Sequence, residues 1–555
     1  MLEQLKARLE RAALVAGVVR KTGAVQWVPP VRLAKLVRSM RQTKLGPHLA
    51  VMYHAAAQPD KEALVEYGDR GVRRLTWAEL DATINRVAHA LSERGVGGGG
   101  RVALMLPNGA EYLIAQQALA RLGATAVQIG YRLKAGEIAY ILENAKPVAT
   151  IVHAEFLLPM QGARMQSKAS DPMLVVDAER ATAKGDFDDW DRALAAASPE
   201  LPPRVTTGDG GGVIVYTSGT TGKPKGANRA WRSTGFESVV QLVGDVGMIA
   251  GDRHLVTCPL YHAAAPAFIA IMAALGATLV LQNHFEPEAC LDIIARERIT
   301  CTLMVPTMLI RICALPAETR ARYDASSLRW VMNCAAALPT ETARQFMAQF
   351  GPILWNFYGA TETGLVTMAG PGDHLTHPGT IGRKMRGNQI RLLDEHGRDV
   401  PRGEVGELYA RNSTMISGYH GNAKATDEAQ REGFFSVGDL ARVDADGYYY
   451  LESRKHDMVI SGGVNIYPRE IEDRLATHPS VLEAAVIGVP DPEWGETLRA
   501  FVVLRDGKTA SERELIDFCR EELADYKKPR KITFLGELPR NPTGKILKRE
   551  LRELA

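Results

Sequence analysis

The loop at residues 216–226, YTSGTTGKPKG, concentrates hydroxyl, glycine and lysine residues, which are the groups that hold phosphate. Glycine lets the backbone turn sharply and bring its N–H groups to an anion, while hydroxyl and ammonium groups add donors and charge. The apolar run at 213–216 predicts a buried strand, and open α/β sheets bind ligands where such strands end. The residues expected to hold phosphate are Thr217, Ser218, Gly219, Thr220, Thr221, Gly222 and Lys225.

This loop differs from the phosphate loop of GTPases and related NTPases. That pattern has four residues between its glycines, followed by Lys and then Ser or Thr. Here Gly219 and Gly222 are too close together, and Lys223 is followed by Pro224, so no hydroxyl stands where Mg²⁺ would be held. An ordinary polar surface loop is the alternative interpretation, and the strongly biased composition disfavours it.

Five further stretches combine aromatic, acidic and glycine residues. They are PLYH at 259–262, NFYGATETG at 356–364, SVGDL at 436–440, ESRKHDMVISGGVNIYPREIE at 452–472 and NPTGKILKREL at 541–551. Each is a weak signal alone. Together and in this order, from about residue 50 to 555, they resemble the adenylate-forming superfamily of acyl-CoA synthetases, nonribosomal adenylation domains and firefly-type luciferases. The resemblance implies that a carboxylate attacks the α-phosphorus of ATP and releases pyrophosphate.

The resemblance also implies roles for four reactive side chains. Lys545 is expected to bridge the substrate carboxylate and the α-phosphate, which Thr361 also contacts. Glu362 is the expected Mg²⁺ ligand, and carboxylate oxygen suits that ion. His262 is expected at the mouth of the acyl pocket beside the reacting carboxylate, although a histidine in an apolar setting is also consistent with a satisfied core residue.

The nucleotide and CoA contacts are likewise implied by the resemblance. The expected ATP and AMP contacts are Ala335, Asn356, Phe357 and Tyr358 around the adenine, with Asp439 and Arg454 at the ribose. Ser461, Gly462 and Gly463 are expected to line the CoA channel. His456 occupies the position of the hinge of the small domain, where the family usually has Asp or Lys.

The segment 261–275, YHAAAPAFIAIMAAL, points to an acid with an apolar body because it carries no charge. Amino-acid-activating relatives are expected to have an acidic residue near position 262. We therefore predict an acid–thiol ligase that converts a medium- or long-chain fatty acid to acyl-AMP and acyl-CoA, using ATP, Mg²⁺ and coenzyme A. A ring-bearing acid, with a steroid side chain or aryl group, and a non-CoA acceptor are the alternatives; a binding-only protein fits least.

The elements that must position these motifs alternate between strand and helix. A capping box, Thr76 to Glu79, opens a helix with one apolar face, and short apolar strands are predicted near 102–106, 254–258, 277–282 and 352–357. This alternation predicts an α/β fold with largely parallel sheets. Beyond Pro468 a compact α+β pattern follows. The predicted organisation is an extension (1–45), a large ATP- and acyl-binding domain (46–455) and a small mobile C-terminal domain (456–555).

Composition and charge limit the partners. The chain has 46% hydrophobic residues and a formal net charge of +3, which gives no reason to expect nucleic acid. Scattered cysteines and no apolar run of roughly 20 residues indicate a reducing, cytoplasmic location.

The charge is unevenly placed along the chain. Residues 1–45 carry ten Lys and Arg against two Glu, a net charge of +8, so the rest of the chain is −5. This basic, amphipathic segment fits either a peripheral contact with a membrane surface or packing on the protein itself. The sequence predicts no oligomeric state.

Overall fold

The computed structural model describes residues 16–203, 210–217, 224–231, 236–541 and 544–555. The chain divides into two compact units. The first comprises residues 1–303, 323–329 and 413–428, and the second comprises 304–322, 330–412 and 429–555. The predicted boundaries at 45/46 and 455/456 do not coincide with this division and remain predictions.

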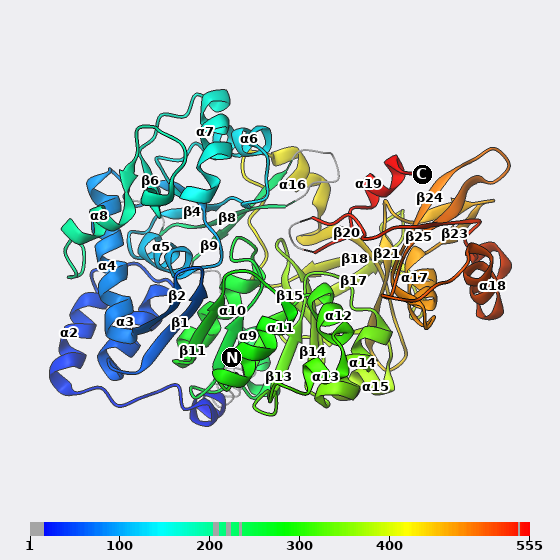
Figure 1. Cartoon of the computed structure of the whole chain (residues 1–555), viewed down its shortest axis with the longest axis horizontal. Helices are drawn as coiled ribbons and strands as arrows, with labels where there is room; N and C mark the ends of the chain where they lie inside the picture. The colour runs from blue at the N-terminus through cyan, green and yellow to red at the C-terminus, as the bar shows by residue number, and fades with distance from the viewer. Residues whose placement is uncertain (1–15, 204–209, 218–223, 232–235, 542–543) are drawn as a thin grey trace. The chain divides into compact units, whose positions relative to one another are not determined.

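The first unit contains two groups of paired strands, most of them parallel (Figure 1). One runs in the order β7-β6-β5-β3-β4-β8-β9, and only β8 and β9 are antiparallel. The other runs β12-β10-β11-β1-β2, with β1 and β2 antiparallel. The strands are β1 (Glu62–Gly68), β2 (Gly71–Thr76), β3 (Arg101–Met105), β4 (Thr125–Gln128), β5 (Ala149–His153), β6 (Met173–Val176), β7 (Asp188–Asp189), β8 (Gly212–Thr217), β9 (Lys225–Ala230), β10 (Arg253–Val256), β11 (Thr278–Gln282) and β12 (Cys301–Met304).

Most helices of this unit connect its successive strands, as expected for parallel sheets. The unit's helices are α2 (Pro30–Met40), α3 (His48–Ala57), α4 (Trp77–Glu93), α5 (Ala110–Arg121), α6 (Ala135–Ala145), α7 (Leu157–Ser167), α8 (Trp190–Ala196), α9 (Phe236–Val246), α10 (Ala264–Leu275), α11 (Pro287–Arg296) and α16 (Ala423–Ala429), with short 3₁₀ turns η1 (Ala154–Phe156) and η2 (Ala178–Arg180). The predicted capping box is confirmed. The Glu79 N–H donates to the Thr76 hydroxyl at 3.3 Å, and the Thr76 N–H donates to the Glu79 carboxylate at 2.8 Å.

The second unit is dominated by antiparallel pairing. One group of paired strands runs β17-β18-β20-β21-β16-β15-β14-β13, and within it only β13 and β14 are parallel. Another runs β23-β22-β25-β24, with β26 parallel to β25. The strands are β13 (Trp330–Asn333), β14 (Leu354–Ala360), β15 (Gly364–Ala369), β16 (Thr380–Lys384), β17 (Gln389–Leu393), β18 (Gly406–Arg411), β19 (Gln430–Arg431), β20 (Phe434–Val443), β21 (Tyr448–Arg454), β22 (Val459–Ser461), β23 (Val464–Ile466), β24 (Val481–Asp491), β25 (Gly495–Leu504) and β26 (Lys531–Phe534).

The helices of this unit are α12 (Pro306–Ala314), α13 (Ala317–Arg320), α14 (Thr340–Phe350), α15 (Pro371–Thr376), α17 (Pro468–Ala476), α18 (Glu512–Glu522) and α19 (Lys548–Glu553), with the 3₁₀ turn η3 (Asp525–Lys527). Helices α17 and α18 pack beside the sheet of β24 and β25, as Figure 1 shows in orange and brown. Their apolar faces bury Ile471, Leu475 and Leu515 in the local core. Among the described residues, no helix combines the length and apolarity needed to cross a bilayer.

An ion-pair network ties the first unit's strands at one edge of the sheet. The Arg253 guanidinium donates to Glu62 at 2.8 Å and also to Glu297, whose side chain is 7% exposed. Arg74 joins the same two carboxylates, and the Tyr67 hydroxyl donates to Glu297 at 2.7 Å. The network links β1, β2 and β10 with the residue after α11.

We expect Arg253→Ala to lower the free energy of unfolding by about 1–3 kcal/mol, because it leaves the buried Glu297 carboxylate without one of its charged donors. The control is Arg296→Ala, which removes only an exposed pair with Asp292 on α11 and is expected to cost under about 1 kcal/mol. Urea unfolding followed by tryptophan fluorescence measures both. Equal losses for the two variants would contradict a special role of this network.

Candidate functional site

The predicted phosphate loop lies between β8 and β9 of the first unit. Residues Ser218, Gly219, Thr220, Thr221 and Gly222 fall in 218–223, which lies outside the described residues. The two flanking residues are described: Thr217 pairs with Lys225 in the antiparallel register, and the Thr217 hydroxyl donates to the Lys225 carbonyl at 3.4 Å. Because β8 runs parallel to β4, Thr217 stands at the carboxyl end of a parallel strand, as predicted.

In the second unit, an aromatic and two charged residues meet across three strands. The Tyr358 hydroxyl of β14 donates to Asp439 Oδ2 of β20 at 2.7 Å. Arg454 of β21 is the register partner of Asp439, and its Nε lies 3.4 Å from Asp439 Oδ1. Burial, and then the Asp439 charge, raise the pKa of the Tyr358 phenol, which therefore stays neutral and donates. Asp439 itself is buried, with 6% of its surface exposed.

A pair of buried amides joins the end of β13 to β14. The Asn333 side chain donates to Asn356 Oδ1 at 2.8 Å, and both residues are buried. Just beyond β13, Ala335 has a φ of +71°, in the left-handed region that side-chain-bearing residues rarely adopt. Such strain often marks functional loops. On β14, Asn356 and Tyr358 share one face, whereas the Phe357 side chain is directed to the opposite one.

A tight turn joins β14 to β15. A Cβ at Gly359 would lie 1.9 Å from the carbonyl oxygen of Gly364, so only glycine fits there. The Ala360 N–H donates to the Thr363 hydroxyl at 3.1 Å, which fixes the turn. The turn residues between them include two of the predicted site residues.

Those two residues are Thr361, which is half-buried, and Glu362, which is 6% exposed. A carboxylate held this deep in a turn needs positive charge nearby. Within the second unit that charge includes the ammonium group of Lys545, on which Glu362 acts electrostatically.

Lys545 is brought to the same cluster by the C-terminal turn. Its N–H donates to Asn541 Oδ1, and its carbonyl accepts the Asn541 N–H, both at 2.9 Å. Burial lowers the pKa of the Lys545 ammonium and the Arg454 charge lowers it further, whereas the Asp439 and Glu362 carboxylates act in the opposite direction. The structure therefore joins four predicted site residues that are far apart in sequence.

His262 belongs to the first unit, in the loop between β10 and α10. The Asn108 side chain holds this loop, because it donates to the Cys258 carbonyl at 3.0 Å and accepts the Leu260 N–H at 2.9 Å. The His262 ring packs 4.3 Å from the Tyr261 ring. The sequence did not predict this role for Asn108, although a polar residue three positions after the end of β3 was a usable signal.

The predicted CoA residues form the turn between β22 and β23. Gly462 and Gly463 both have positive φ, +57° and +81°, which a two-residue hairpin turn requires. A Cβ at Gly462 would meet the Trp494 ring at 2.7 Å, and the Gly462 N–H donates to the Trp494 carbonyl at 2.8 Å. The hairpin turn alone therefore requires glycine at these two positions, and their predicted role in lining the CoA channel remains a prediction. Ser461 ends β22 directly before them.

The predicted hinge residue, His456, follows β21. Its carbonyl accepts a hydrogen bond from Arg552 at 3.4 Å, and Arg552 also pairs with Asp457 at 3.0 Å. On the other side, the Lys455 N–H donates to the Gly438 carbonyl at 2.8 Å. The segment thus connects β20 with the C-terminal helix α19, and its role as a pivot remains a prediction.

Comparison with known proteins shows which family this chain belongs to. Residues 52–420 match the family model described as AMP-binding enzyme, and residues 470–545 match its C-terminal domain. A feruloyl-CoA synthase from an Amycolatopsis species is 34% identical, covering 92% of this chain and 97% of the relative. The long-chain-fatty-acid–CoA ligase FadD13 of Mycobacterium tuberculosis is 33% identical, with 86% and 93% covered.

Solved structures are also similar to this chain. The anthranilate CoA ligase AuaEII in complex with anthranoyl-AMP has a TM-score of 0.85 and 28% identity, covering 92% of this chain and 97% of that chain. ATP-bound MatB from Rhodopseudomonas palustris has a TM-score of 0.80 and 30% identity, covering 92% and 99%. The predicted family and fold class are thereby confirmed. The chain belongs to the AMP-binding enzyme family as an acyl-CoA synthetase, with that family's mixed α/β fold of a large N-terminal and a small C-terminal domain.

Proposed function

We propose that this acyl-CoA synthetase activates a medium- or long-chain fatty acid. The observation that carries the proposal is the uncharged segment that follows His262, where Ala263 and Ala264 are half-buried and α10 continues without a charged residue. Such a surface suits an apolar acyl body and offers no partner for a substrate ammonium group. The similarity to a long-chain-fatty-acid–CoA ligase supports the same class.

A ring-bearing acid is the second candidate, favoured by an aromatic cluster next to His262. The Tyr131 ring stacks on Phe156 with a centroid separation of 5.2 Å and meets the Tyr261 ring edge-on at 5.2 Å. Aromatic rings pack well in both geometries, so the cluster offers a surface for a further ring. Relatives named as feruloyl-CoA synthase and indoleacetate–CoA ligase support this class.

The first step that we propose is attack of the substrate carboxylate on the α-phosphorus of ATP, with loss of pyrophosphate. Because an anion attacks a polyanion, the catalytic contribution is mainly charge neutralisation and positioning. Lys545 would bridge the two reacting groups, Thr361 would contact the α-phosphate, and Thr217 and Lys225 would flank the β- and γ-phosphates. His262 would stand beside the substrate carboxylate.

The nucleoside would be held by the strand cluster of the second unit. Tyr358 and the backbones near Asn356, Phe357 and Ala335 would contact adenine. Each Asp439 oxygen has lone pairs beyond those used by Tyr358 and Arg454, so the same carboxylate has capacity for both ribose hydroxyls. Its existing bonds fix the carboxylate before the nucleotide binds.

Glu362 fits the part of a Mg²⁺ ligand, since it is a buried carboxylate in a rigid turn and oxygen is the ligand that Mg²⁺ prefers. When bound, Mg²⁺ would neutralise phosphate charge. In the second step, Ser461, Gly462 and Gly463 would line the path of CoA, with His456 as the pivot of the small domain. We place the enzyme in the cytoplasm, with residues 1–45 at a membrane surface.

Incubation with ATP, Mg²⁺, CoA and an acid is expected to yield AMP, pyrophosphate and acyl-CoA. A pyrophosphate-release panel from C2 to C20 acids, plus cholate and benzoates, with and without CoA, identifies the substrate. The largest kcat/KM for C8 to C20 acids supports the fatty-acid proposal, and the largest value for a ring-bearing acid replaces it with the second candidate. Formation of ADP and phosphate would contradict the whole scheme.

Lys545→Ala is expected to lower the rate of adenylate formation roughly 10²–10³-fold, because it removes one key electrostatic donor. Acyl-CoA formation from supplied acyl-adenylate should be nearly unchanged, since the carboxylate and the α-phosphate that Lys545 is expected to bridge are then already joined by a covalent bond. Both half-reactions are followed by separate assays. Equal losses of rate in adenylate formation and acyl-CoA formation would contradict the role proposed for Lys545.

Arg469 on α17 connects the C-terminal region to the Ala335 loop, because it donates to the Leu338 carbonyl and pairs with Asp473 at 2.8 Å. Arg474 on the same helix offers a matched control. It also donates to a backbone carbonyl, that of Phe518, but this contact stays between α17 and α18.

Arg469→Met is expected to slow adenylate formation roughly tenfold, the scale of one charged hydrogen bond, because the Ala335 loop, which we expect to contact adenine, loses its link to α17. Conversion of supplied acyl-adenylate should change less than adenylate formation does. Arg474→Met should alter thermal stability without separating the two half-reactions. The role fails if Arg469→Met slows both half-reactions by the same factor as Arg474→Met.

A further inference from the structure

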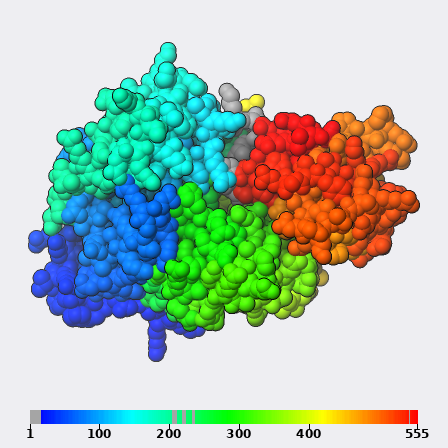
Figure 2. Space-filling view, in the orientation of Figure 1, coloured from blue at the N-terminus to red at the C-terminus, as the bar shows by residue number. Residues whose placement is uncertain are grey.

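The first described stretch of the chain is cationic throughout. Residues 16–59 contain no Asp or Glu. They carry seven basic residues, Arg20, Lys21, Arg32, Lys35, Arg38, Arg41 and Lys44. Figure 2 shows the dark blue atoms of this stretch at the surface of the molecule. The stretch therefore presents concentrated positive charge to the solvent.

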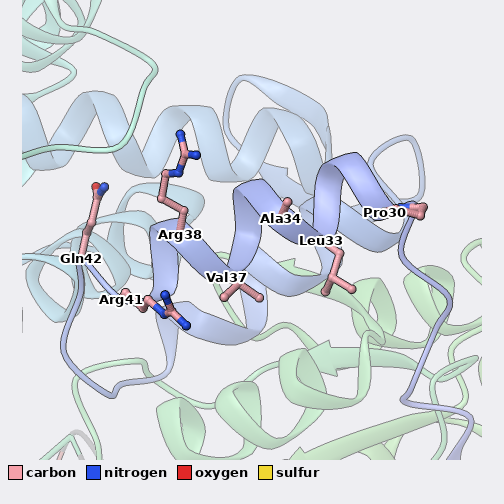
Figure 3. A pocket seen from close by; sticks show the side chains of 7 residues that line it. All are labelled: Pro30, Leu33, Ala34, Val37, Arg38, Arg41 and Gln42. Carbon is pink, nitrogen blue, oxygen red and sulfur yellow. The ribbon is translucent and has the colours of Figure 1, made fainter.

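Helix α2 within this stretch also exposes apolar side chains. It packs on α3, but Leu36 is its one buried residue. Leu33 and Val37 are 45% and 41% exposed, and they stand one turn apart on the same side of the helix. Figure 3 shows Leu33, Val37 and Arg41 projecting from that side of the helix, whereas Arg38 points the other way.

An exposed tryptophan precedes α2 in the chain. Trp27 is 76% exposed, although the backbone next to it is fixed. The Gln26 N–H donates to the Tyr53 hydroxyl at 2.6 Å, and that hydroxyl donates to the Gln26 carbonyl at 2.9 Å. The indole ring is thus displayed to the solvent from an anchored segment. We name Trp27, Leu33, Val37, Arg38 and Arg41 the α2 surface.

We propose that the α2 surface docks the protein on an anionic lipid bilayer. A row of apolar side chains flanked by cations matches the boundary between acyl chains and anionic headgroups, and tryptophan favours the same depth. Nucleic acid would satisfy the arginines but leave Leu33 and Val37 in water. The inference does not depend on which acid the enzyme activates, although a bilayer is where long-chain acids partition.

The test is co-sedimentation of the full chain with vesicles of phosphatidylcholine alone or mixed with phosphatidylglycerol. We expect binding to the anionic vesicles only, weakened by added salt. Leu33→Asp with Val37→Asp should weaken it roughly tenfold or more, and Arg38→Gln with Arg41→Gln roughly fivefold per charge removed. Trp27 fluorescence should shift to the blue on binding, and Trp27→Phe should lose that shift.

Matched controls lie elsewhere on the first unit. Leu158→Asp changes a leucine that is 63% exposed on α7, and Lys424→Gln removes an exposed cation on α16; both should bind as the wild type does. Activity on a short soluble acid should be unchanged in the α2 variants, which shows that they fold. A chain lacking residues 1–15 should still bind.

Four results would overturn the proposal. They are no binding to anionic vesicles, equal binding to neutral vesicles, unchanged binding of the α2 variants, and loss of all binding on removal of residues 1–15. A change of oligomeric state in the α2 variants, measured by light scattering without vesicles, would assign the surface to a second copy of the chain instead.

Discussion

The constraint on which the candidate site depends is the confinement of one lysine ammonium among buried charges. Burial and the guanidinium of Arg454 oppose the charge of Lys545, while the carboxylates of Asp439 and Glu362 sustain it. A cation so balanced is well suited to a reaction that brings further negative charge into the site. The surrounding structure of the second unit keeps these groups in place.

Each member of the cluster is held by a different device. Asp439 is fixed by the register of β20 and β21 and by the Tyr358 hydroxyl. Glu362 is fixed by a turn that tolerates only glycine at position 359. Lys545 is fixed by paired hydrogen bonds with Asn541. Three backbone arrangements therefore converge on one electrostatic site.

The features that depend on residues close together in the sequence could be predicted. The capping box at Thr76 and the alternating strands and helices follow from residue types and spacing, and the family follows from the resemblance of the motifs; the structure and the comparisons confirm them. Contacts between distant segments could not be predicted in this way. Nothing in the sequence pairs Arg469 with the Leu338 carbonyl, or Asn108 with the backbone before His262.

Some local backbone conformations also could not be predicted from the sequence. The left-handed backbone of Ala335 has no sequence signal, because glycine or asparagine is the usual occupant of that region. Gly462 was predicted to line the CoA channel, which stays a prediction; its turn and its Trp494 neighbour are features that the sequence did not reveal. The acyl specificity is the least predictable part, since small uncharged residues accommodate both chains and rings.

The most direct test of the account is the alkaline limb of the adenylation rate. Lysine carries its charge below its pKa, so a lowered pKa means that the charge is lost at a lower pH. We predict that kcat/KM for ATP, which reports the free enzyme, falls at a pH below the ordinary lysine value of about 10.4. In Lys545→Arg, however slow, this fall should disappear because guanidinium stays charged. The same alkaline fall in Lys545→Arg would contradict the assignment of the central charge to Lys545.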